Sequence, residues 1–181
     1  AVVTDAPPED RLPSRTVVVR DAREAFSLAC LHFCGDPQKK LRLCAVTGTN
    51  GKTTVASMLS EILKEGGYKT FLIGTEGAGS GSDFEKTGYT TPPPEILSRL
   101  LRKAADEGDD FVIMEASSHS LDQKRLFGLG FELGIFTNLT RDHLDYHKSV
   151  EAYSAAKAKL FSLCRHSVLN FDDPRAYEMA W

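Results

Sequence analysis

The chain of 181 residues carries 22 Lys and Arg against 25 Asp and Glu, a formal net charge of −3, and 41% of its residues are hydrophobic. This composition is typical of a globular protein with one sizeable domain and an attachment, and it argues against a broad nucleic-acid-binding surface. No apolar stretch approaches the ~20 residues that a membrane span needs, and no signal peptide is recognisable, so we expect a cytoplasmic protein without membrane insertion.

The N-terminal part of the chain is typical of the end of a preceding domain. Proline and charged residues predict little regular structure up to residue 15, before a short apolar strand over 16–19. Asp21 is placed to cap a helix over 22–34. The polar stretch GDPQKK that follows is typical of a linker, so we interpret residues 1–38 as the tail of a domain and its linker.

From residue 39 onward, predicted strands and helices alternate. We expect strands over 41–46, 68–74, 110–115, 133–138 and 166–171. We expect helices over 53–65, 92–108 and 150–164, the start of another over 173–181, and a Gly/Ser-rich loop over 77–89. Such alternation predicts an α/β fold with a mostly parallel sheet and flanking helices. Ligands of these sheets bind at the carboxyl ends of the strands.

The stretch VTGTNGKTT at residues 46–54 has the character of a phosphate-binding loop, although the common pattern G-x-x-x-x-G-K-[ST] requires a glycine where Val46 occurs. It lies between a predicted strand and a predicted helix, where unpaired N–H groups and the helix dipole favour anions. Lys52 adds a cation and Thr53 a hydroxyl that suits Mg²⁺, so we favour nucleotide binding over an ordinary Gly-rich turn. The predicted cradle comprises Gly48, Thr49, Asn50, Gly51, Lys52, Thr53 and Thr54.

Polar residues follow the predicted strand that ends at Glu115. A carboxylate at that place commonly holds the Mg²⁺ of a neighbouring phosphate-binding loop, although a strand-terminal Glu by itself is as often structural. The segment from Ser117 to Arg125, which includes Gln123, would line the same edge of the sheet, or else form a capped turn with a solvated face.

A second polar segment, TNLTRDHLDYH, contains His143 among carboxylates. This combination suits a divalent metal, although a single His is more often structural. On the predicted helix that follows, Lys157 shares a face with Tyr153 and Leu160, which indicates partial burial. A buried Lys must lose its charge, find a partner or be modified, but the sequence alone favours a side chain that reaches from the helix to solvent.

Five stretches together resemble the Mur ligase family, most closely its UDP-N-acetylmuramoyl-tripeptide synthetase (MurE) type. They occur in the family's order: VTGTNGKTT, TTPPPEIL, MEASSHSLDQKRL, FTNLTRDHLDYH and YSAAKAKLF. The first two are shared across related ligases, whereas EASSHSL and TNLTRDHLDYH point much more narrowly to this type. The family's own loop has the short form T-G-T-N-G-K-T-T, so Val46 departs from the general pattern but not from the family's.

The resemblance implies an ATP-dependent ligase of peptidoglycan synthesis, which adds a free amino acid to UDP-N-acetylmuramoyl-dipeptide through an acyl phosphate. It implies that Thr53 and Glu115 hold a Mg²⁺, and that His143 and Lys157 serve a second one, Lys157 as N6-carboxylysine. The implied catalytic residues are Lys52, Glu115, His143 and Lys157. The implied contacts to the UDP-muramoyl peptide are Thr90, Thr91, Ser117, Gln123 and Arg125.

The chain is shorter than a complete member of the family, which has three domains. We therefore interpret residues 39–181 as the first part of the central ATPase domain, and expect a monomer that is inactive by itself. Which amino acid is added stays open at this stage.

Two alternatives to this ligase remain, a folylpolyglutamate or cyanophycin synthetase-like ligase and a non-catalytic ATP-binding scaffold. Folate ligases usually have GKGS where this chain has GKTT, and EASSHSL argues against both other ligases. Intact Lys52, Glu115, His143 and Lys157 argue against a scaffold.

Overall fold

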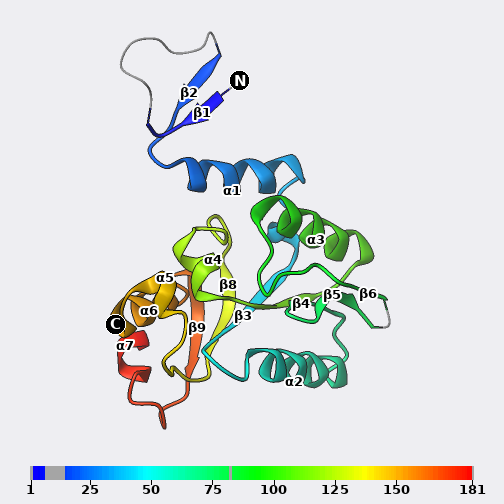
Figure 1. The fold of residues 1–181 in the computed structure, drawn as a ribbon. Helices are drawn as coiled ribbons and strands as arrows, with labels where there is room; N and C mark the ends of the chain where they lie inside the picture. The colour runs from blue at the N-terminus through cyan, green and yellow to red at the C-terminus, as the bar shows by residue number, and fades with distance from the viewer. Residues whose placement is uncertain (1, 7–14, 82, 181) are drawn as a thin grey trace.

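The computed structural model describes residues 2–6, 15–81 and 83–180 (Figure 1). Near the N-terminus, β1 (Val2–Thr4) pairs in parallel with β2 (Thr16–Val18). The second strand is predicted, whereas the first contradicts the expectation of irregular structure, because its β-branched valines suit a strand once a partner is present. The rest of that predicted irregular stretch, residues 7–14, lies outside the described residues.

The main domain is built on a seven-stranded sheet with the strand order β6-β5-β4-β7-β3-β8-β9. Its parallel strands are β3 (Arg42–Thr47), β4 (Thr70–Gly74), β7 (Phe111–Glu115), β8 (Phe131–Phe136) and β9 (Cys164–Leu169). The helices are α1 (Ala22–Phe33), α2 (Lys52–Glu65), α3 (Pro94–Glu107), α4 (Ser118–Asp122), α5 (Leu144–His147), α6 (Val150–Ala158) and α7 (Ala176–Ala180), with 3₁₀ turns at Pro37–Lys40 and Phe161–Leu163. The predicted fold, a mostly parallel α/β sheet with flanking helices, is confirmed.

The predicted loop over 77–89 is wrong, because an antiparallel hairpin extends the sheet there. β5 (Gly77–Ser80) pairs with β4, and β6 (Asp83–Glu85) pairs with β5. A Cβ atom on Gly79 would lie 1.8 Å from the carbonyl oxygen of Asp83. The glycines that suggest a loop are therefore residues that let two backbones approach closely.

The predicted helix over 150–164 is shorter in the structure, since α6 ends at Ala158 and a 3₁₀ turn follows. The chain turns there because β9 begins at Cys164, which is the register partner of Phe131 in β8. Cys164 Sγ also donates to the carbonyl oxygen of Leu160 at 3.2 Å, which links the start of β9 to the residue that precedes the turn.

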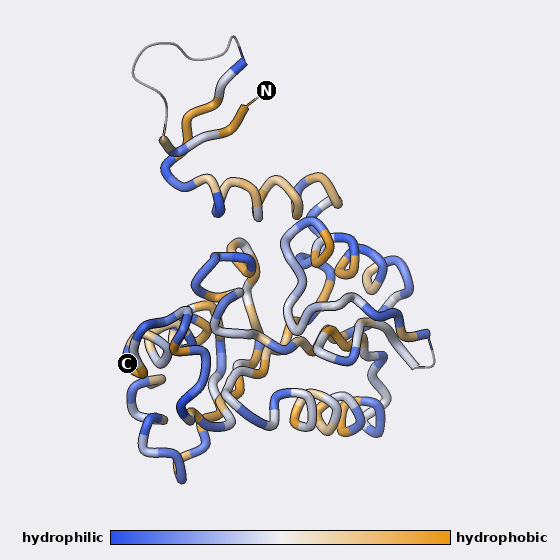
Figure 2. Tube along the Cα trace, in the orientation of Figure 1, coloured by the Kyte–Doolittle hydropathy of each residue, from blue (hydrophilic) through white to orange (hydrophobic). Residues whose placement is uncertain are grey.

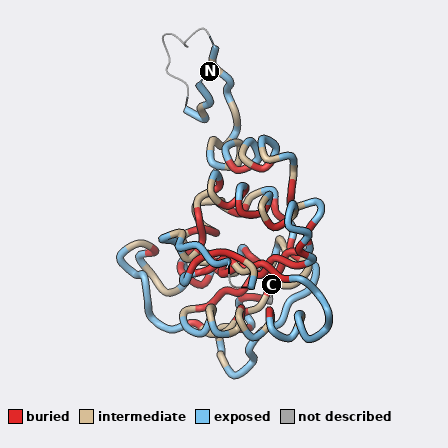
Figure 3. The backbone as a smooth tube through the Cα atoms, turned by 90° about the vertical axis from the view of Figure 1, so that its right-hand side faces the viewer, coloured by how far each residue is buried: buried red, intermediate tan, exposed pale blue. Residues whose placement is uncertain are grey.

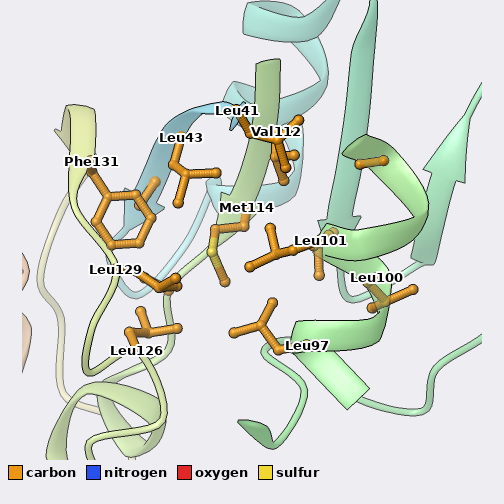
Figure 4. Packing of buried hydrophobic residues seen from close by; sticks show 14 of the residues in the cluster. Leu41, Leu43, Leu97, Leu100, Leu101, Val112, Met114, Leu126, Leu129 and Phe131 are labelled. Carbon is orange, nitrogen blue, oxygen red and sulfur yellow. The ribbon is translucent and has the colours of Figure 1, made fainter. Parts of the chain in front are cut away.

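Side chains alternate along the strands and divide the core between the two faces of the sheet. On one face, Leu43 of β3 and Met114 of β7 pack with leucines of α3 (Figure 4). On the other face, Cys44 and Ile113, their neighbours in sequence, pack with α2. Figure 2 shows the hydrophobic colouring concentrated in the strands and on the inner sides of the helices, and Figure 3 shows the same central region as buried.

Helix α1 packs on the main domain, above α3 in Figure 1. Asp21 caps it as predicted, since its Oδ1 accepts hydrogen bonds from two backbone N–H groups at the start of the helix. Leu31 is buried in the same cluster as the leucines of α3. The boundary after residue 38 stays a prediction. Among the described residues, none of the helices is long and apolar enough to cross a membrane.

Candidate functional site

The predicted phosphate-binding loop joins β3 to α2 at the carboxyl edge of the sheet. Gly51 caps α2 with a φ of 83°, a left-handed conformation that suits glycine. A Cβ atom on Gly48 would lie 1.9 Å from Oγ1 of Thr137, and that hydroxyl donates to the carbonyl oxygen of Asn50 at 2.7 Å. The segment after β8 therefore fixes the shape of the loop. Val46, where the general pattern has glycine, is a fully buried residue of β3 that packs with α2.

Two lysine ammonium groups converge on one carbonyl oxygen of this loop. Lys52 Nζ donates to the carbonyl oxygens of Gly48 and Thr49, at 3.0 and 2.9 Å. Lys157 Nζ donates to the same Gly48 oxygen at 2.7 Å. In the part of the chain that the structure describes, neither ammonium group forms an ion pair with a carboxylate. Two such cations beside the N-terminus of a helix favour an anion such as phosphate.

Lys157 is 1% exposed, so the predicted solvent-reaching side chain is wrong. Its helix packs through Tyr153, which is also buried, and Nζ lies 4.6 Å from the centre of the Tyr153 ring. Burial, and to a lesser extent the charge of Lys52, lowers the pKa of Lys157 to about 7. Burial also lowers the pKa of Lys52. A sizeable fraction of the Lys157 amine is therefore neutral and nucleophilic near pH 7.

Glu115 ends β7 beside the loop and is 2% exposed. Its Oε1 accepts hydrogen bonds from Oγ1 of Thr53 and from the backbone N–H of Thr75, both at 2.9 Å. Its Oε2 accepts a further bond from Oγ1 of Thr75 at 3.1 Å. A Cβ atom on Gly74 would lie 2.3 Å from Oε1, so glycine at the end of β4 leaves room for the carboxylate. The structure thus brings the predicted metal ligands Thr53 and Glu115 together.

The donor set of Glu115 and Thr53 fits Mg²⁺, which prefers carboxylate and hydroxyl oxygens. Among the residues described, no three His, Cys, Asp or Glu side chains are grouped so that they alone could hold a metal ion. This is the usual situation for Mg²⁺ at nucleotide sites, where one or two protein ligands act together with phosphate oxygens.

His143 lies near Lys157 without contacting it. It has a φ of 50° at the start of α5, and its half-exposed ring has Nε2 3.5 Å from Oδ2 of Asp142. The ring centre lies 4.9 Å from that of His119 and 6.1 Å from that of Tyr153. His143 and Lys157 therefore share Tyr153 as a neighbour, but in the described structure no hydrogen bond joins them. Their common metal site stays a prediction.

Three of the predicted substrate contacts are hydrogen-bonded to the Glu115 region. Thr90 Oγ1 lies 3.0 Å from Oγ1 of Thr75. Thr91 Oγ1 donates to the carbonyl oxygen of Glu115 at 2.8 Å and accepts from the N–H of Ser117 at 3.0 Å. Ser117 also caps α4, so the alternative of a capped turn describes this segment correctly as well.

The other two predicted contacts, Gln123 and Arg125, bind each other. Nε and Nη2 of Arg125 donate to Oε1 of Gln123 at 3.0 and 2.7 Å, while Nη1 donates to the carbonyl oxygen of Thr91 at 2.9 Å. All five predicted substrate contacts therefore belong to one edge of the domain.

Sequence reasoning missed Thr75, which donates two hydrogen bonds to Glu115 and contacts Thr90. Thr75 follows β4, and β4 is adjacent to β7 in the sheet. The order of strands in a sheet is not readable from alternation alone, so the only available signal was a polar residue directly after a strand.

The chain has a glycine-containing loop between a parallel strand and a helix, followed by Lys52, and the carboxylate of Glu115 lies at the end of the adjacent strand. These features are typical of P-loop-type nucleotide-binding α/β domains. Within that class the assignment is narrower. The Mur ligase middle domain model matches residues 46–180, and the chain belongs to the Mur ligase family.

The sequences of similar proteins agree with this family assignment. The chain is 46% identical over 158 residues to UDP-N-acetylmuramoyl-L-alanyl-D-glutamate–2,6-diaminopimelate ligase of Clostridium perfringens, covering 87% of this chain and 33% of the relative. It is 44% identical over 182 residues to the ligase of the same name from Phocaeicola vulgatus, covering 98% and 38%. The chain thus spans about a third of the length of the curated relatives that it matches.

Solved structures show the same relationship. A structure of a UDP-N-acetylmuramoyl-L-alanyl-D-glutamate–2,6-diaminopimelate ligase superposes with a TM-score of 0.86 at 35% identity, over 99% of this chain and 37% of that one. An FPGS–AMPPCP–folate complex gives a TM-score of 0.66 at 17% identity, over 92% of this chain and 48% of that one. The second similarity is one of fold alone.

Proposed function

We propose that the protein containing this chain is an ATP-dependent amide ligase that adds a free amino acid to UDP-N-acetylmuramoyl-dipeptide in peptidoglycan synthesis. The observation that carries the proposal is the convergence of Lys52 and Lys157 on the carbonyl oxygen of Gly48, close to the Glu115–Thr53 pair. Such a reaction joins two anions, ATP and a carboxylate, so it requires fixed positive charge where they meet.

In this proposal, residues 48–54 bind the ATP phosphates through the ammonium group of Lys52 and the N–H groups at the start of α2. The N–H groups of Thr49 and Asn50 instead donate to the carbonyl oxygen and Oδ1 of Asn138, at 2.8 and 3.0 Å, and so hold the loop in shape. Thr53 and Glu115 would hold a Mg²⁺, which when bound supplies positive charge to the phosphate oxygens. These contacts hold the γ-phosphate against the substrate carboxylate, which attacks it to form an acyl phosphate as ADP leaves. The amine of the incoming amino acid then displaces phosphate and forms the amide. The protein's main contribution is positioning and electrostatic stabilisation.

Lys157 is proposed to act as N6-carboxylysine and, with His143, to serve a second Mg²⁺. The neutral amine adds to CO₂ with formation of an N–C bond, and a proton is released to water. The lowered pKa of Lys157, about 7, supports this step because it leaves amine available at neutral pH. The product is an anionic oxygen ligand, which suits Mg²⁺ better than an ammonium group does.

The proposed contacts to the UDP-linked substrate lie at the same edge of the domain. Thr90, Thr91, Ser117, Gln123 and Arg125 are proposed to contact the UDP-muramoyl peptide. The relatives at 44–46% identity are named as 2,6-diaminopimelate ligases, so diaminopimelate is the amino acid we propose first. We propose that the ligase acts as a monomer.

The alternatives are less well supported. The similarity to FPGS is one of fold at 17% identity, whereas the diaminopimelate ligases are up to 48% identical to this chain over the aligned residues. A non-catalytic scaffold would not need a buried Lys157 and a partly buried Lys52 that have no carboxylate partner among the described residues, because burying an unpaired charge is costly.

The test of the proposal is Lys52→Ala in the whole ligase of which we propose this chain is a part. We propose that the ammonium group of Lys52 stabilises the negative charge on the phosphoryl group during its transfer. We therefore expect kcat of Lys52→Ala to fall about 100-fold or more with the fold preserved. Lys64→Ala is the matched control, since Lys64 is on the same helix and pairs with Glu61 at the surface. Unchanged turnover of Lys52→Ala at saturating ATP would contradict the assignment.

A further inference from the structure

A cavity of about 320 Å³ lies between α1 and the proposed substrate contacts. It is lined by Arg23, Phe26 and Ser27 of α1, by Pro93, Pro94 and Glu95 at the start of α3, and by Gln123 and Arg125. The last two residues are proposed to contact the UDP-muramoyl peptide. The cavity is therefore adjacent to the substrate site, and α1 forms one of its walls.

The lining of this cavity favours an anionic group. Arg23 is exposed, and among the described residues its guanidinium group has no hydrogen bond or ion pair. Arg125 is the second cation, and Glu95 is the single carboxylate of the lining, so positive charge is in excess. Phe26 is 49% exposed and offers an apolar surface beside these charges.

Lys124, between Gln123 and Arg125, holds α1 against the cavity. Its Nζ donates to Oδ2 of Asp21 at 2.6 Å and to Oε1 of Glu24 at 2.7 Å. Its carbonyl oxygen accepts a hydrogen bond from Oγ of Ser27 at 2.9 Å. Lys124 has a φ of 58°, which a glycine would adopt more readily, so its pairing with α1 accounts for a lysine here.

We propose that this cavity is an additional subsite for the UDP-linked substrate. Arg23 binds an anionic group of that substrate, a phosphate or a carboxylate, and Lys124 is a positioning residue that keeps α1 in place. The inference rests on the proposed function, because UDP-N-acetylmuramoyl-dipeptide carries both a diphosphate and carboxylates. Arg23 would thus extend recognition from the main domain onto α1.

The first experiment compares Arg23→Ala with Arg20→Ala in the whole ligase. Arg20 is exposed, precedes α1 and does not line the cavity, so it is a matched control for the loss of one arginine. We expect Arg23→Ala to raise the KM for the UDP-linked substrate about tenfold, the effect of one charge-assisted hydrogen bond, with kcat and the KM for ATP unchanged. Arg20→Ala should change none of these values.

The role of Lys124 is tested by Lys124→Met and Lys124→Arg. We expect the methionine variant to raise the KM for the UDP-linked substrate alone, and the arginine variant to restore it, because arginine can again pair with Asp21 and Glu24. Calorimetric binding of UDP-N-acetylglucosamine, which carries the diphosphate but no carboxylate, and of N-acetylmuramoyl-dipeptide, each to the wild type and to Arg23→Ala, identifies the anion. Weaker binding of only the first indicates the diphosphate, and weaker binding of only the second a carboxylate.

Two results separate this inference from the proposed function. An unchanged KM in Arg23→Ala, together with a raised KM in Arg125→Ala, would overturn the subsite and leave the ligase intact. A wild-type protein that ligates no amino acid to the UDP-linked substrate would overturn the proposed function and the subsite with it.

Discussion

The two lysines of the site show how burial changes the chemistry of a single residue. Lys52 and Lys157 are both cations in water, but burial lowers the pKa of each, and both ammonium groups contact the carbonyl oxygen of Gly48. A phosphate between them would restore the charged form, because an anion nearby raises the pKa of a lysine. Binding of nucleotide and protonation of these lysines are therefore coupled.

The proposed modification of Lys157 gives a prediction for two variants of the whole ligase. Lys157→Ala should lose most of its activity, and a small carboxylic acid in solution should restore part of it by supplying the missing anionic oxygens. Lys157→Arg should remain inactive, because arginine keeps its charge and cannot be carbamylated. Turnover with and without added acid measures both effects, and a fully active arginine variant would contradict the modification.

The lowered pKa of Lys157 also predicts how the metal-free chain responds to pH. The folded state releases the proton near pH 7 and the unfolded state near 10.5, so the unfolded state binds more protons between these values. The free energy of unfolding should therefore rise with pH, by about 1 kcal/mol per unit from pH 7 to 8.5. Urea denaturation in CO₂-free buffer with chelator should show this slope, and Lys157→Met should have a smaller one. Equal slopes for both chains would contradict the burial of a titrating amine.

At the scale of elements, the hairpin β5–β6 depends on glycine. Gly79→Ala would place a Cβ atom 1.8 Å from the carbonyl oxygen of Asp83, so we expect roughly 1–3 kcal/mol of destabilisation, measured by urea denaturation. Gly130→Ala is the control, because no atom lies within 4 Å of a Cβ there. A Gly79→Ala chain as stable as the control would show that β6 does not need to pair closely with β5.

The elements that the sequence predicts well are those whose pattern is local. The parallel strands and the helices α1 to α3 follow from apolar runs, the Asp21 cap and terminal glycines such as Gly108. The hairpin was missed because close packing of two backbones depends on a partner strand, which the sequence does not identify. A glycine-rich sequence also occurs in loops, so it does not distinguish a loop from a hairpin. The burial of Lys157 was missed for a similar reason, since it depends on how α6 packs beside the loop of Gly48.

The candidate site was predictable to the extent that its residues occur in contiguous motifs. Thr53 and Glu115 could be paired in advance, because both belong to the carboxyl edge of a parallel sheet. Thr75 could not be added, since its role depends on β4 being adjacent to β7. The position of Arg23 beside the proposed substrate contacts likewise depends on the tertiary position of α1.

The site as a whole is assembled by topology, because the segments that form it are far apart in the chain. The loop after β3, the end of β7 and the segment after β8 meet since these three strands are adjacent in the sheet. Helix α6 then brings Lys157 to the same point from beyond β8. The proposed phosphate contacts lie within the described domain, whereas none of its described residues is assigned to the incoming amine.

We therefore predict that the 181-residue chain binds Mg²⁺·ATP but does not ligate an amino acid to the UDP-linked substrate. The chain spans about a third of the length of its diaminopimelate-ligase relatives, and both substrates must be held in reacting geometry for catalysis. Loss of that positioning forfeits on the order of 7–11 kcal/mol of barrier reduction. Calorimetry with a non-hydrolysable ATP analogue measures the first part, with Lys52→Ala as the control that should bind more weakly. Phosphate release with diaminopimelate measures the second, and turnover near that of a whole ligase would show that one domain is sufficient.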